Sequence, residues 1–495
     1  MSFSEEILKQ EREQEWRAEL RKTMKAKERT GIPRVRMPEN DPNVRNKNHM
    51  EVNIGLSEEQ ALNEAKRCID CANPTCITGC PVGINIPKFI KRIEQGEFLE
   101  AAKVLKETNA LPAVCGRVCP QEVQCESQCF YTQKMKLEPV AIGNLERFAA
   151  DYERNSGKIS VPEIKERNTI KIGVIGSGPS GLAVAGDLIK WGYSVTVFEA
   201  LHQIGGVLKY GIPEFRLPND MVDVEIDILK KMGVEFRTNF VVGKTASFDD
   251  LRAQGYKAFF VGSGAGLPNF MNIPGENYVG IFSSNEYLTR VNLMGASKSD
   301  FDTPVISGKK VAVIGGGNTA MDAVRTSKRL GAERSMIIYR RSIEEMPARN
   351  EEIKHAQEEG IEFLNLNNPL EYYAGSKGRV NKMKIQKMEL GEPDDSGRRR
   401  PVPIEGSEYE VEVDTVVVAV GVSPNPLIPS SLPQLEMSKW GTIIVDKETM
   451  QSSIPDVFAG GDIVRGGATV ILAMGDGRKA AAGIHKYIEE TVLKK

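Results

Sequence analysis

Residues 171–200 read KIGVIGSGPSGLAVAGDLIKWGYSVTVFEA, and they decide the fold. The apolar run 172–175 is typical of a buried parallel strand, and it leads directly into a G-x-G-x-x-G turn at 176–181. A helix is expected next, over 182–190, followed by a second buried strand that ends at Glu199. This succession of strand, glycine turn, helix, strand and acid indicates a dinucleotide-binding unit.

The glycines and the acid have separate tasks in such a unit. Gly176 permits the tight turn, Gly178 lets the backbone approach a pyrophosphate, and Gly181 lets the helix pack closely on the strand. The amides and the dipole at the helix start favour negative charge, and Glu199 can accept hydrogen bonds from a ribose diol. A glycine-rich turn without a ligand is the alternative, but the flanking strands and the acid favour a binding site. The first dinucleotide is therefore expected at Gly176, Gly178, Pro179, Ser180, Gly181 and Glu199.

Two later segments are expected to complete this first site. The glycine pair 205–206 allows backbone to lie beside the ligand. Residues 457–462 read as a strand ending in Asp462, which would point at the ribityl or pyrophosphate part of the cofactor; a helix-capping acid is the alternative. The last helix starts near residue 469, with its amides available to the same cofactor. The residues assigned here are Gly206, Val207, Leu208, Arg216, Gly461, Asp462, Thr469 and Val470.

A second dinucleotide motif follows, with a different ending. Residues 310–314 predict a strand, and the turn GGGNTA at 315–320 has alanine in the permitted third place. The next strand ends in Arg340-Arg341 instead of an acid. A carboxylate would repel a 2′-phosphate, whereas two guanidiniums bind one bidentately, so NADP is expected rather than NAD. The alternative is that the two arginines merely solvate a strand end. The residues assigned to this site are Gly315, Gly317, Asn318, Thr319, Ala320, Arg340, Arg341, Arg349, Val420 and Gly421.

All eight cysteines lie between residues 68 and 129. They form two runs: Cys68, Cys71, Cys76 and Cys80 before Pro81, then Cys115, Cys119 before Pro120, Cys125 and Cys129. Disulfides are unexpected without an export signal. Two closed zinc sites and reduced structural thiols are alternatives, but tight runs with Cys-Pro favour two [4Fe-4S] clusters.

The cysteine before proline often serves the other cluster in two-cluster folds, so a crossed partition is expected. The first cysteine group is then Cys68, Cys71, Cys76 and Cys129. The second cysteine group is Cys80, Cys115, Cys119 and Cys125.

Composition limits the remaining possibilities. The chain has 495 residues, a formal net charge of −2 and 27% charged residues, so no global field would recruit nucleic acid or an anionic membrane. No signal-peptide core and no long apolar run occur, which predicts a cytoplasmic protein. The expected domains are an N-terminal arm (1–50), a helical iron–sulfur domain (51–150), a first dinucleotide domain in two parts (168–300 and 425–495) and a second dinucleotide domain (301–424). The arm is either solvated or a docking segment for a partner.

Two nucleotide sites, one nested in the other, are the layout of flavoproteins with two dinucleotide-binding domains. The sequence resembles the small (beta) subunits of NADPH-dependent glutamate synthases from the cysteine runs to Asp462. The reductase half of dihydropyrimidine dehydrogenase and bifurcating ferredoxin:NADP reductase subunits share this architecture. The resemblance is carried by CIDCANPTCITGCPVGINIPKFI, CGRVCPQEVQCESQC, GSGPSGLAVA, GGVLKYGIPEFRLP and GGGNTAMDAVR. It implies an α/β fold with two nested Rossmann-like domains, for FAD and NADPH, preceded by an α-helical domain with two [4Fe-4S] clusters.

The resemblance also implies a function. NADPH would give hydride to FAD, and the clusters would pass electrons to the glutamate synthase large (alpha) subunit, which forms glutamate from glutamine and 2-oxoglutarate. The alternatives are the NADPH-linked subunit of a ferredoxin or dihydropyrimidine dehydrogenase system, and a non-catalytic assembly subunit that keeps the fold. No acid–base catalytic residue is expected, because hydride transfer needs positioning rather than proton chemistry.

Overall fold

Two parallel five-stranded sheets carry the two glycine turns. The computed structural model describes residues 4–305, 308–394 and 397–494 of the chain. The first sheet has the order β16 (Val457–Ala459), β4 (Tyr256–Val261), β1 (Lys171–Ile175), β2 (Ser194–Phe198) and β3 (Glu235–Arg237). The second sheet has the order β6 (Ile281–Ser283), β14 (Thr415–Val418), β7 (Lys310–Ile314), β8 (Arg334–Tyr339) and β9 (Glu362–Asn365).

The central strands are apolar and buried because helices cover them, as in other parallel sheets. The first unit has α11 (Pro179–Lys190), α12 (Val207–Tyr210), α13 (Asn219–Met232), α14 (Phe248–Ala253), α18 (Leu427–Ser431), α19 (Asp462–Arg465), α20 (Val470–Ile488) and the π-helical end η5 (Glu489–Leu493). The second has α15 (Ser284–Asn292), α16 (Asn318–Arg329), η3 (Ile343–Glu345) and α17 (Asn350–Glu358). An antiparallel sheet inserted before β14 consists of β10 (Asn367–Ala374), β11 (Val380–Pro393), β12 (Arg399–Pro403) and β13 (Tyr409–Glu412). The short helix η4 (Ser376–Gly378) connects β10 to β11.

The chain passes between the two dinucleotide units where β5 (Leu267–Pro268) pairs with β15 (Val422–Ser423). The sequence-based boundary at residue 301 lies later than this crossing. Strand β6 pairs with β14 of the second sheet, so residues 281–292, including α15, belong to the second unit. The run 281–283 is too short to show a strand period, which is why its sheet could not be assigned from the sequence.

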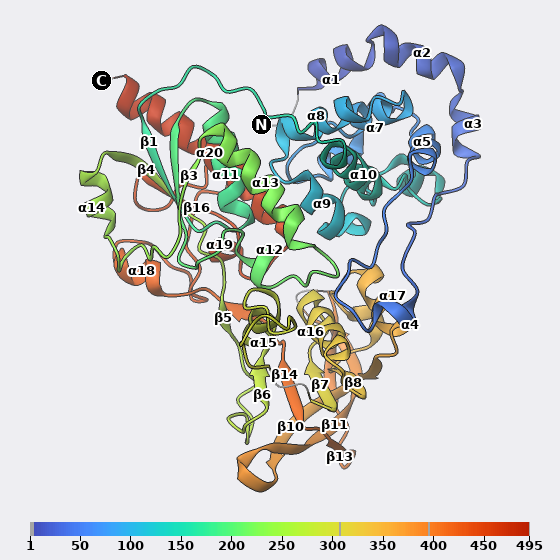
Figure 1. Ribbon diagram of the computed structural model, residues 1–495, viewed down its shortest axis with the longest axis vertical. Helices are drawn as coiled ribbons and strands as arrows, with labels where there is room; N and C mark the ends of the chain where they lie inside the picture. The colour runs from blue at the N-terminus through green and yellow to red at the C-terminus, as the bar shows by residue number, and fades with distance from the viewer. Residues whose placement is uncertain (1–3, 306–307, 395–396, 495) are drawn as a thin grey trace.

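The cysteine-bearing unit is helical, as expected, and is preceded by an arm. Its elements are α5 (Glu58–Lys66), α6 (Thr75–Thr78), α7 (Ile86–Glu94), α8 (Phe98–Thr108), α9 (Pro112–Val118), η1 (Gln121–Val123), η2 (Tyr131–Met135) and α10 (Ile142–Asn155). The arm contains α1 (Glu5–Arg12), α2 (Glu15–Thr23), α3 (Ala26–Thr30) and α4 (Pro42–Arg45). Figure 1 shows α1–α3, in blue, along the outside of this unit.

One hydrophobic core extends from the cysteine-bearing unit into the first dinucleotide unit, and it includes Phe89, Cys115, Leu182 and Met474. The two units are therefore packed together rather than merely tethered. The expected fold class is confirmed: a helical unit precedes two nested α/β units (Figure 1). Within the described ranges, no helix has both the length and the apolar character needed to cross a membrane.

Candidate functional site

The first glycine turn joins β1 to α11, and its three glycines are needed for different reasons. Gly176 has φ +97°, and a Cβ there would lie 2.5 Å from the Gly262 carbonyl oxygen at the end of β4. A Cβ at Gly181 would lie 2.0 Å from the Gly176 carbonyl oxygen, so this glycine lets helix and turn pack. A Cβ at Gly178 would meet nothing within 4 Å, and its φ of −70° suits any residue. Neither packing nor backbone strain requires glycine at 178, which leaves close approach by a ligand as the reason.

The turn is fixed by the acid that ends β2. Glu199 is buried, and its Oε2 accepts hydrogen bonds from the Ser177 amide (2.9 Å) and hydroxyl (2.5 Å). Its Oε1 accepts one from the Leu201 amide at 2.8 Å. A carboxylate has about four acceptor positions. Glu199 therefore orients the turn and keeps acceptor capacity at Oε1 for a ribose hydroxyl.

A valine at position 178 is expected to abolish flavin binding without unfolding the chain. Its side chain would enter the open space beside the turn and exclude the pyrophosphate, so flavin content should fall at least about tenfold, corresponding to 1.4 kcal/mol or more. Flavin absorbance per chain after purification checks this. Gly317→Val is the reciprocal control, because it should keep the flavin but lose reduction by NADPH. A Gly178→Val protein with full flavin content would remove this turn from the site.

The second turn, between β7 and α16, repeats the same geometry. Gly315 has φ +140°, and a Cβ there would lie 2.4 Å from the Ala419 carbonyl oxygen at the end of β14. A Cβ at Gly317 would meet nothing within 4 Å. In both turns, the first glycine packs against the end of the neighbouring strand, and the second glycine faces open space. This repetition fits two dinucleotides, one at each turn.

Arginines gather where β8 ends. Arg340 is exposed and forms no ion pair among the described residues, whereas Arg341 is buried. Arg341 donates to the Arg399 carbonyl (2.8 Å) and to Asp394 (2.5 Å) at the β11–β12 hairpin. Arg340 and Arg341 line the central cavity, and so does Arg398 of the β11–β12 hairpin. The sequence did not indicate Arg398, because strand pairing brings it to this rim from 58 residues downstream of Arg340.

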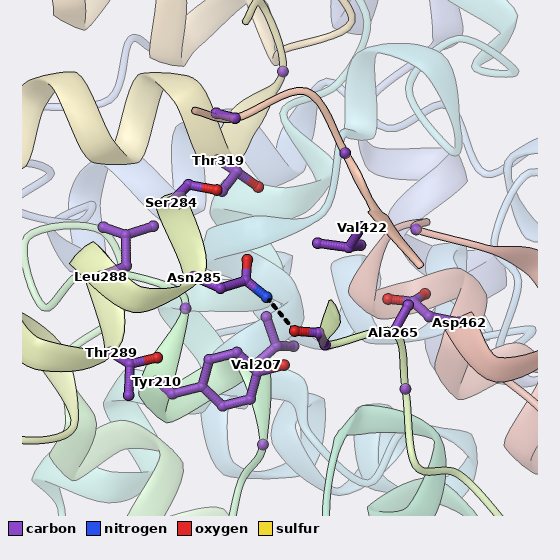
Figure 2. Close-up of a pocket in the computed structure, with 18 of the residues that line it drawn as sticks. Val207, Tyr210, Ala265, Ser284, Asn285, Leu288, Thr289, Thr319, Val422 and Asp462 are labelled. Atoms are coloured by element: carbon purple, nitrogen blue, oxygen red, sulfur yellow. Dashed lines mark hydrogen bonds between the residues drawn. The ribbon is translucent and has the colours of Figure 1, made fainter. Parts of the chain in front are cut away.

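A single cavity of about 1670 Å³ contacts both turns. Its volume exceeds the ~300–1,000 Å³ of a typical single-ligand pocket, and so suits two dinucleotides that meet end to end. Figure 2 shows Val207, Tyr210 and Asp462 of the first unit around the same space as Thr319 of the second. Helix α15 forms a further wall, where Asn285 donates to the Gly266 carbonyl at 3.1 Å.

The turn before α19 places Asp462 in this cavity. Gly461 has φ +76°, and its amide donates to Asp476 of α20 at 3.1 Å. Asp462 accepts a hydrogen bond from the Ala468 amide at 3.1 Å, and burial raises its pKa to about 6. Near neutral pH this acid is mainly ionised, so it can accept a hydrogen bond from a cofactor hydroxyl.

Five of the assigned residues do not line the cavity: Gly181, Leu208, Ala320, Arg349 and Gly461. Leu208 is wholly buried in the hydrophobic core, because α12 turns it away from the ligand side. The Arg349 guanidinium points toward the cysteine-bearing unit instead, so we drop Leu208 and Arg349 from the proposed ligand contacts. The glycines and Ala320 act through packing of the turns.

Arg216 lines the cavity but is already engaged. Its guanidinium binds both oxygens of Asp322 at 2.7 Å and reaches Glu352 at 2.9 Å. Burial opposes the charge of Arg216, but these two carboxylates raise its pKa above the ordinary range. Arg216 therefore ties the loop before α13 to α16 and α17, and its proposed role is to hold the two dinucleotide units together.

The crossed partition of the cysteines stays a prediction, and the groups that shift the cysteine pKa values support it. After burial, the charges that raise the pKa of Cys76 belong to the other three members of the first cysteine group. Burial and then the first-group neighbours Cys68 and Cys129 raise the pKa of Cys71 to about 12. In the second group, a hydrogen bond with Cys115 and then burial raise the pKa of Cys119. Cysteines bind a metal as thiolates, so thiols with raised pKa values would release protons on binding.

The spacing within each group is too wide for zinc. One zinc ion holds four thiolates at about 2.3 Å, which places the sulfurs about 3.8 Å apart. All eight cysteines are described, yet no three of their sulfurs lie within 4.8 Å of one another. A larger metal–sulfur core, with a separate iron beside each thiolate, fits this spacing better. The residues present therefore fit iron–sulfur clusters.

The second cysteine group lies against the cavity. Cys115 Sγ is 3.6 Å from Met474 Sδ of α20, and Ala473, the residue before it, lines the cavity. Val118, which precedes Cys119, lines the cavity directly. Neither Met474 nor Val118 was expected from the sequence, since both are apolar residues within ordinary helical patterns.

The first cysteine group lies farther out, and the arm holds it. Asp70, between Cys68 and Cys71, has φ +53° and is fully buried. Its carboxylate binds Arg17 and, at 2.6 Å, Arg21 of α2. The arm is therefore neither simply solvated nor free for docking along these residues, because two of its arginines anchor the loop of the first group.

The chain matches two known protein families, one over the cysteine-bearing unit and one over the dinucleotide units. Residues 45–158 match the family described as dihydropyrimidine dehydrogenase domain II, 4Fe-4S cluster. Residues 170–477 match the family of pyridine nucleotide-disulphide oxidoreductases.

Relatives with curated descriptions cover nearly the whole chain. The glutamate synthase (NADPH) small chain of Escherichia coli K12 is 38% identical over 92% of this chain and 98% of its own length. The same subunit of Azospirillum brasilense is 38% identical over 91% of this chain and 94% of its own. The NADP(+)-dependent formate dehydrogenase subunit beta of Moorella thermoacetica is 38% identical over 84% of this chain but 60% of its own length.

Among solved structures, Mycobacterium tuberculosis FprA in complex with NADPH is similar to this chain. The TM-score is 0.55 at 20% identity, over 66% of this chain and 86% of that one. At this identity the similarity supports the fold of the dinucleotide units alone.

Proposed function

Because this chain belongs to the family of the glutamate synthase (NADPH) small chains, we propose that it supplies electrons to a glutamate synthase large (alpha) subunit. It is an NADPH-dependent oxidoreductase with FAD and iron–sulfur groups. The proposal adds that two [4Fe-4S] clusters carry the electrons, and that the large subunit uses them to form glutamate from glutamine and 2-oxoglutarate.

The cofactors supply the chemistry: flavin accepts a hydride from NADPH and can release its electrons singly to iron–sulfur clusters. The chain's own residues bind and orient. The proposed FAD contacts are the 176–181 turn, Glu199 and Asp462, and the proposed NADPH contacts are the 315–320 turn and Arg340. Because both turns open into one cavity, the two nucleotides can meet there in a fixed orientation.

One observation carries the electron route. Helix α20 separates the cavity from the second cysteine group by a single layer of residues. Ala473 lines the cavity, and Sδ of the next residue, Met474, lies 3.6 Å from Cys115 Sγ. The second group is thus the proposed entry point for electrons. Among the groups that raise the pKa of Cys125, after burial and Glu126, are Cys80 of its own group and, more weakly, Cys76 of the first. The two groups are near neighbours, so the first group is the proposed next carrier.

The first cysteine group leads to the surface. Cys71 is half-buried, and the next residues, Ala72 and Asn73, are exposed. Exposed apolar side chains occur in the same unit, with Val123 70% exposed and Phe130 40% exposed. A surface of this kind suits a partner protein, so this face is the proposed exit toward the large subunit.

A second candidate is favoured by the breadth of the relatives. The Moorella formate dehydrogenase subunit and a Geobacter sulfurreducens NADPH-Fe(3+) oxidoreductase subunit contain similar modules, at 38% and 36% identity. The same input module could therefore serve a ferredoxin or a dihydropyrimidine dehydrogenase type of system.

Reconstitution separates the two candidates. The anaerobically purified chain is mixed with the glutamate synthase large subunit of the same organism, with NADPH, glutamine and 2-oxoglutarate. A stable complex that forms glutamate in an NADPH-dependent manner is the expected result. A chain that reduces ferredoxin with NADPH but neither binds the large subunit nor supports glutamate formation would overturn the glutamate synthase assignment.

A further inference from the structure

The segment 346–350, between η3 and α17, lies between the second glycine turn and the cysteine-bearing unit. Pro347 lines the central cavity, and Arg349 at the start of α17 is 8% exposed. The sequence suggested a phosphate contact for Arg349, but its guanidinium points away from the cavity. Arg349 contacts the second glycine turn on one side and the cysteine-bearing unit on the other, and neither contact is explained by direct binding of a nucleotide or a metal.

On one side, the segment holds the second glycine turn. The Arg349 amide donates to Asn318 Oδ1 at 2.9 Å, and Asn318 is the first residue of α16 and a lining residue of the cavity. The Ala348 amide donates to the Gly316 carbonyl at 3.3 Å. These bonds use the backbone of the segment, so they do not depend on the identity of side chain 349.

On the other side, the Arg349 guanidinium straddles Cys119. Its Nη1 donates to the Arg117 carbonyl at 2.8 Å, and its Nη2 donates to Gln121 Oε1 at 2.9 Å. These acceptors are two residues before and two residues after the cysteine. The Arg117 carbonyl lies in the last turn of α9, where helix carbonyls lack intrahelical partners and favour a cation.

The acceptor Gln121 is itself held rigidly and reaches a second cysteine. A Cβ at Gly143 of α10 would lie 2.2 Å from Gln121 Nε2, so the side chain packs directly on helix backbone. The Gln121 carbonyl accepts from the amides of Gln124 and Glu126, at 3.1 Å each, on either side of Cys125. A displacement of Arg349 would therefore reach two members of the second cysteine group.

We propose that Arg349 is a positioning residue through which nucleotide binding at the 315–320 turn alters the cluster held by the second cysteine group. This inference rests on the proposed function, namely NADPH at that turn and a cluster at those cysteines. The link is short: the bond from the Arg349 amide to Asn318 is partly buried and the two bonds of the guanidinium are buried, so packed elements can transmit a shift of the turn. By linkage, the state of the cluster must affect nucleotide affinity by the same factor.

The test uses dithionite-reduced, fully loaded protein and 2′-phospho-ADP-ribose, which fills a phosphate turn but cannot accept hydride. In the wild type, the probe should change the EPR line shape of one of the two clusters. In Arg349→Ala the probe should still bind within about threefold of its wild-type affinity, since the backbone bond to Asn318 remains, but the spectral change should be lost. Gln121→Ala, which removes the acceptor on the other side, should give the same loss.

Lys354→Ala is the matched control. Lys354 is in the same helix, is 57% exposed and pairs with Glu39 of the arm rather than with α9, so this variant should keep the spectral change. Arg349→Lys should restore it in part, because the ammonium group can still donate to one of the two acceptors but lacks the fork that spans both. A change that persists in Arg349→Ala, or a wild type that binds the probe with no change at either cluster, would overturn the inference alone. A wild type without iron, or one that does not bind the probe, would overturn the proposed function and the inference with it.

Discussion

Replacing Cys119 by alanine is expected to remove about half of the bound iron, from about eight to about four per chain, and to disconnect the flavin from the acceptor. NADPH should still reduce the flavin at close to the wild-type rate, because Cys119 itself does not line the cavity and the residues of both glycine turns are unchanged. Turnover with a protein acceptor should fall on the order of 100-fold or more, since the second cysteine group is the carrier beside the cavity. Iron analysis, flavin bleaching and acceptor reduction measure the three quantities.

Two further variants make this expectation specific. Cys76→Ala should also lose about half of the iron. Its remaining cluster lies beside the cavity and should still be reduced by NADPH. The cluster that remains in Cys119→Ala should not be reduced by NADPH. Val123→Ser, an exposed change between Cys119 and Cys125, should keep all of the iron. Full iron content or undiminished acceptor turnover in Cys119→Ala would contradict the proposed route.

Loss of the arginines at the end of β8 is expected to turn an NADPH-specific protein into one that barely distinguishes the two coenzymes. In Arg340→Ala/Arg341→Ala, kcat/KM for NADPH should fall on the order of 100-fold or more, because each charged hydrogen bond contributes about 1.5–3 kcal/mol and 1.4 kcal/mol is tenfold. The value for NADH should change less than about threefold, since NADH has no 2′-phosphate. Steady-state kinetics with both coenzymes give the comparison.

The structure separates the two arginines. Arg340 is exposed at the cavity, while Arg341 is anchored by Asp394 and the Arg399 carbonyl, so Arg340→Ala alone should produce most of the loss. Arg334→Ala is the control, since Arg334 begins the same strand and binds Glu362 at 2.7 Å. Equal losses with NADPH and NADH in the double variant would remove the 2′-phosphate assignment.

The local features of the site were predictable from the sequence because glycine geometry is local. The strand, turn and helix at 171–190 appear where the sequence places them, with α11 beginning three residues earlier at Pro179. The open second glycines, Gly178 and Gly317, follow from the spacing of the motif alone. The crossed partition of the cysteines stays a prediction; it is supported by the charges that raise the pKa of Cys76, which come from the other three members of its group.

Contacts between distant segments were not predictable. Arg349 and Gln121 are separated by 228 residues, and nothing in either local sequence indicates that they meet. Arg349 follows the strand that ends in Arg340-Arg341, and this position suggested that it binds a phosphate. Tertiary packing instead directs its side chain to α9. The same limit applies to Asp70, whose partners Arg17 and Arg21 come from an arm that composition alone presents as a solvated helix.

The most direct test of the electron-input function is metal, sulfide and flavin analysis of the anaerobically purified protein, with NADPH added in the same cuvette. We expect about eight irons, about eight sulfides and one FAD per chain, with the flavin bleached by NADPH. Zinc in place of iron, or a flavin that NADPH does not bleach, would contradict the proposed passage of electrons from NADPH through the cavity to the cysteine-bearing unit.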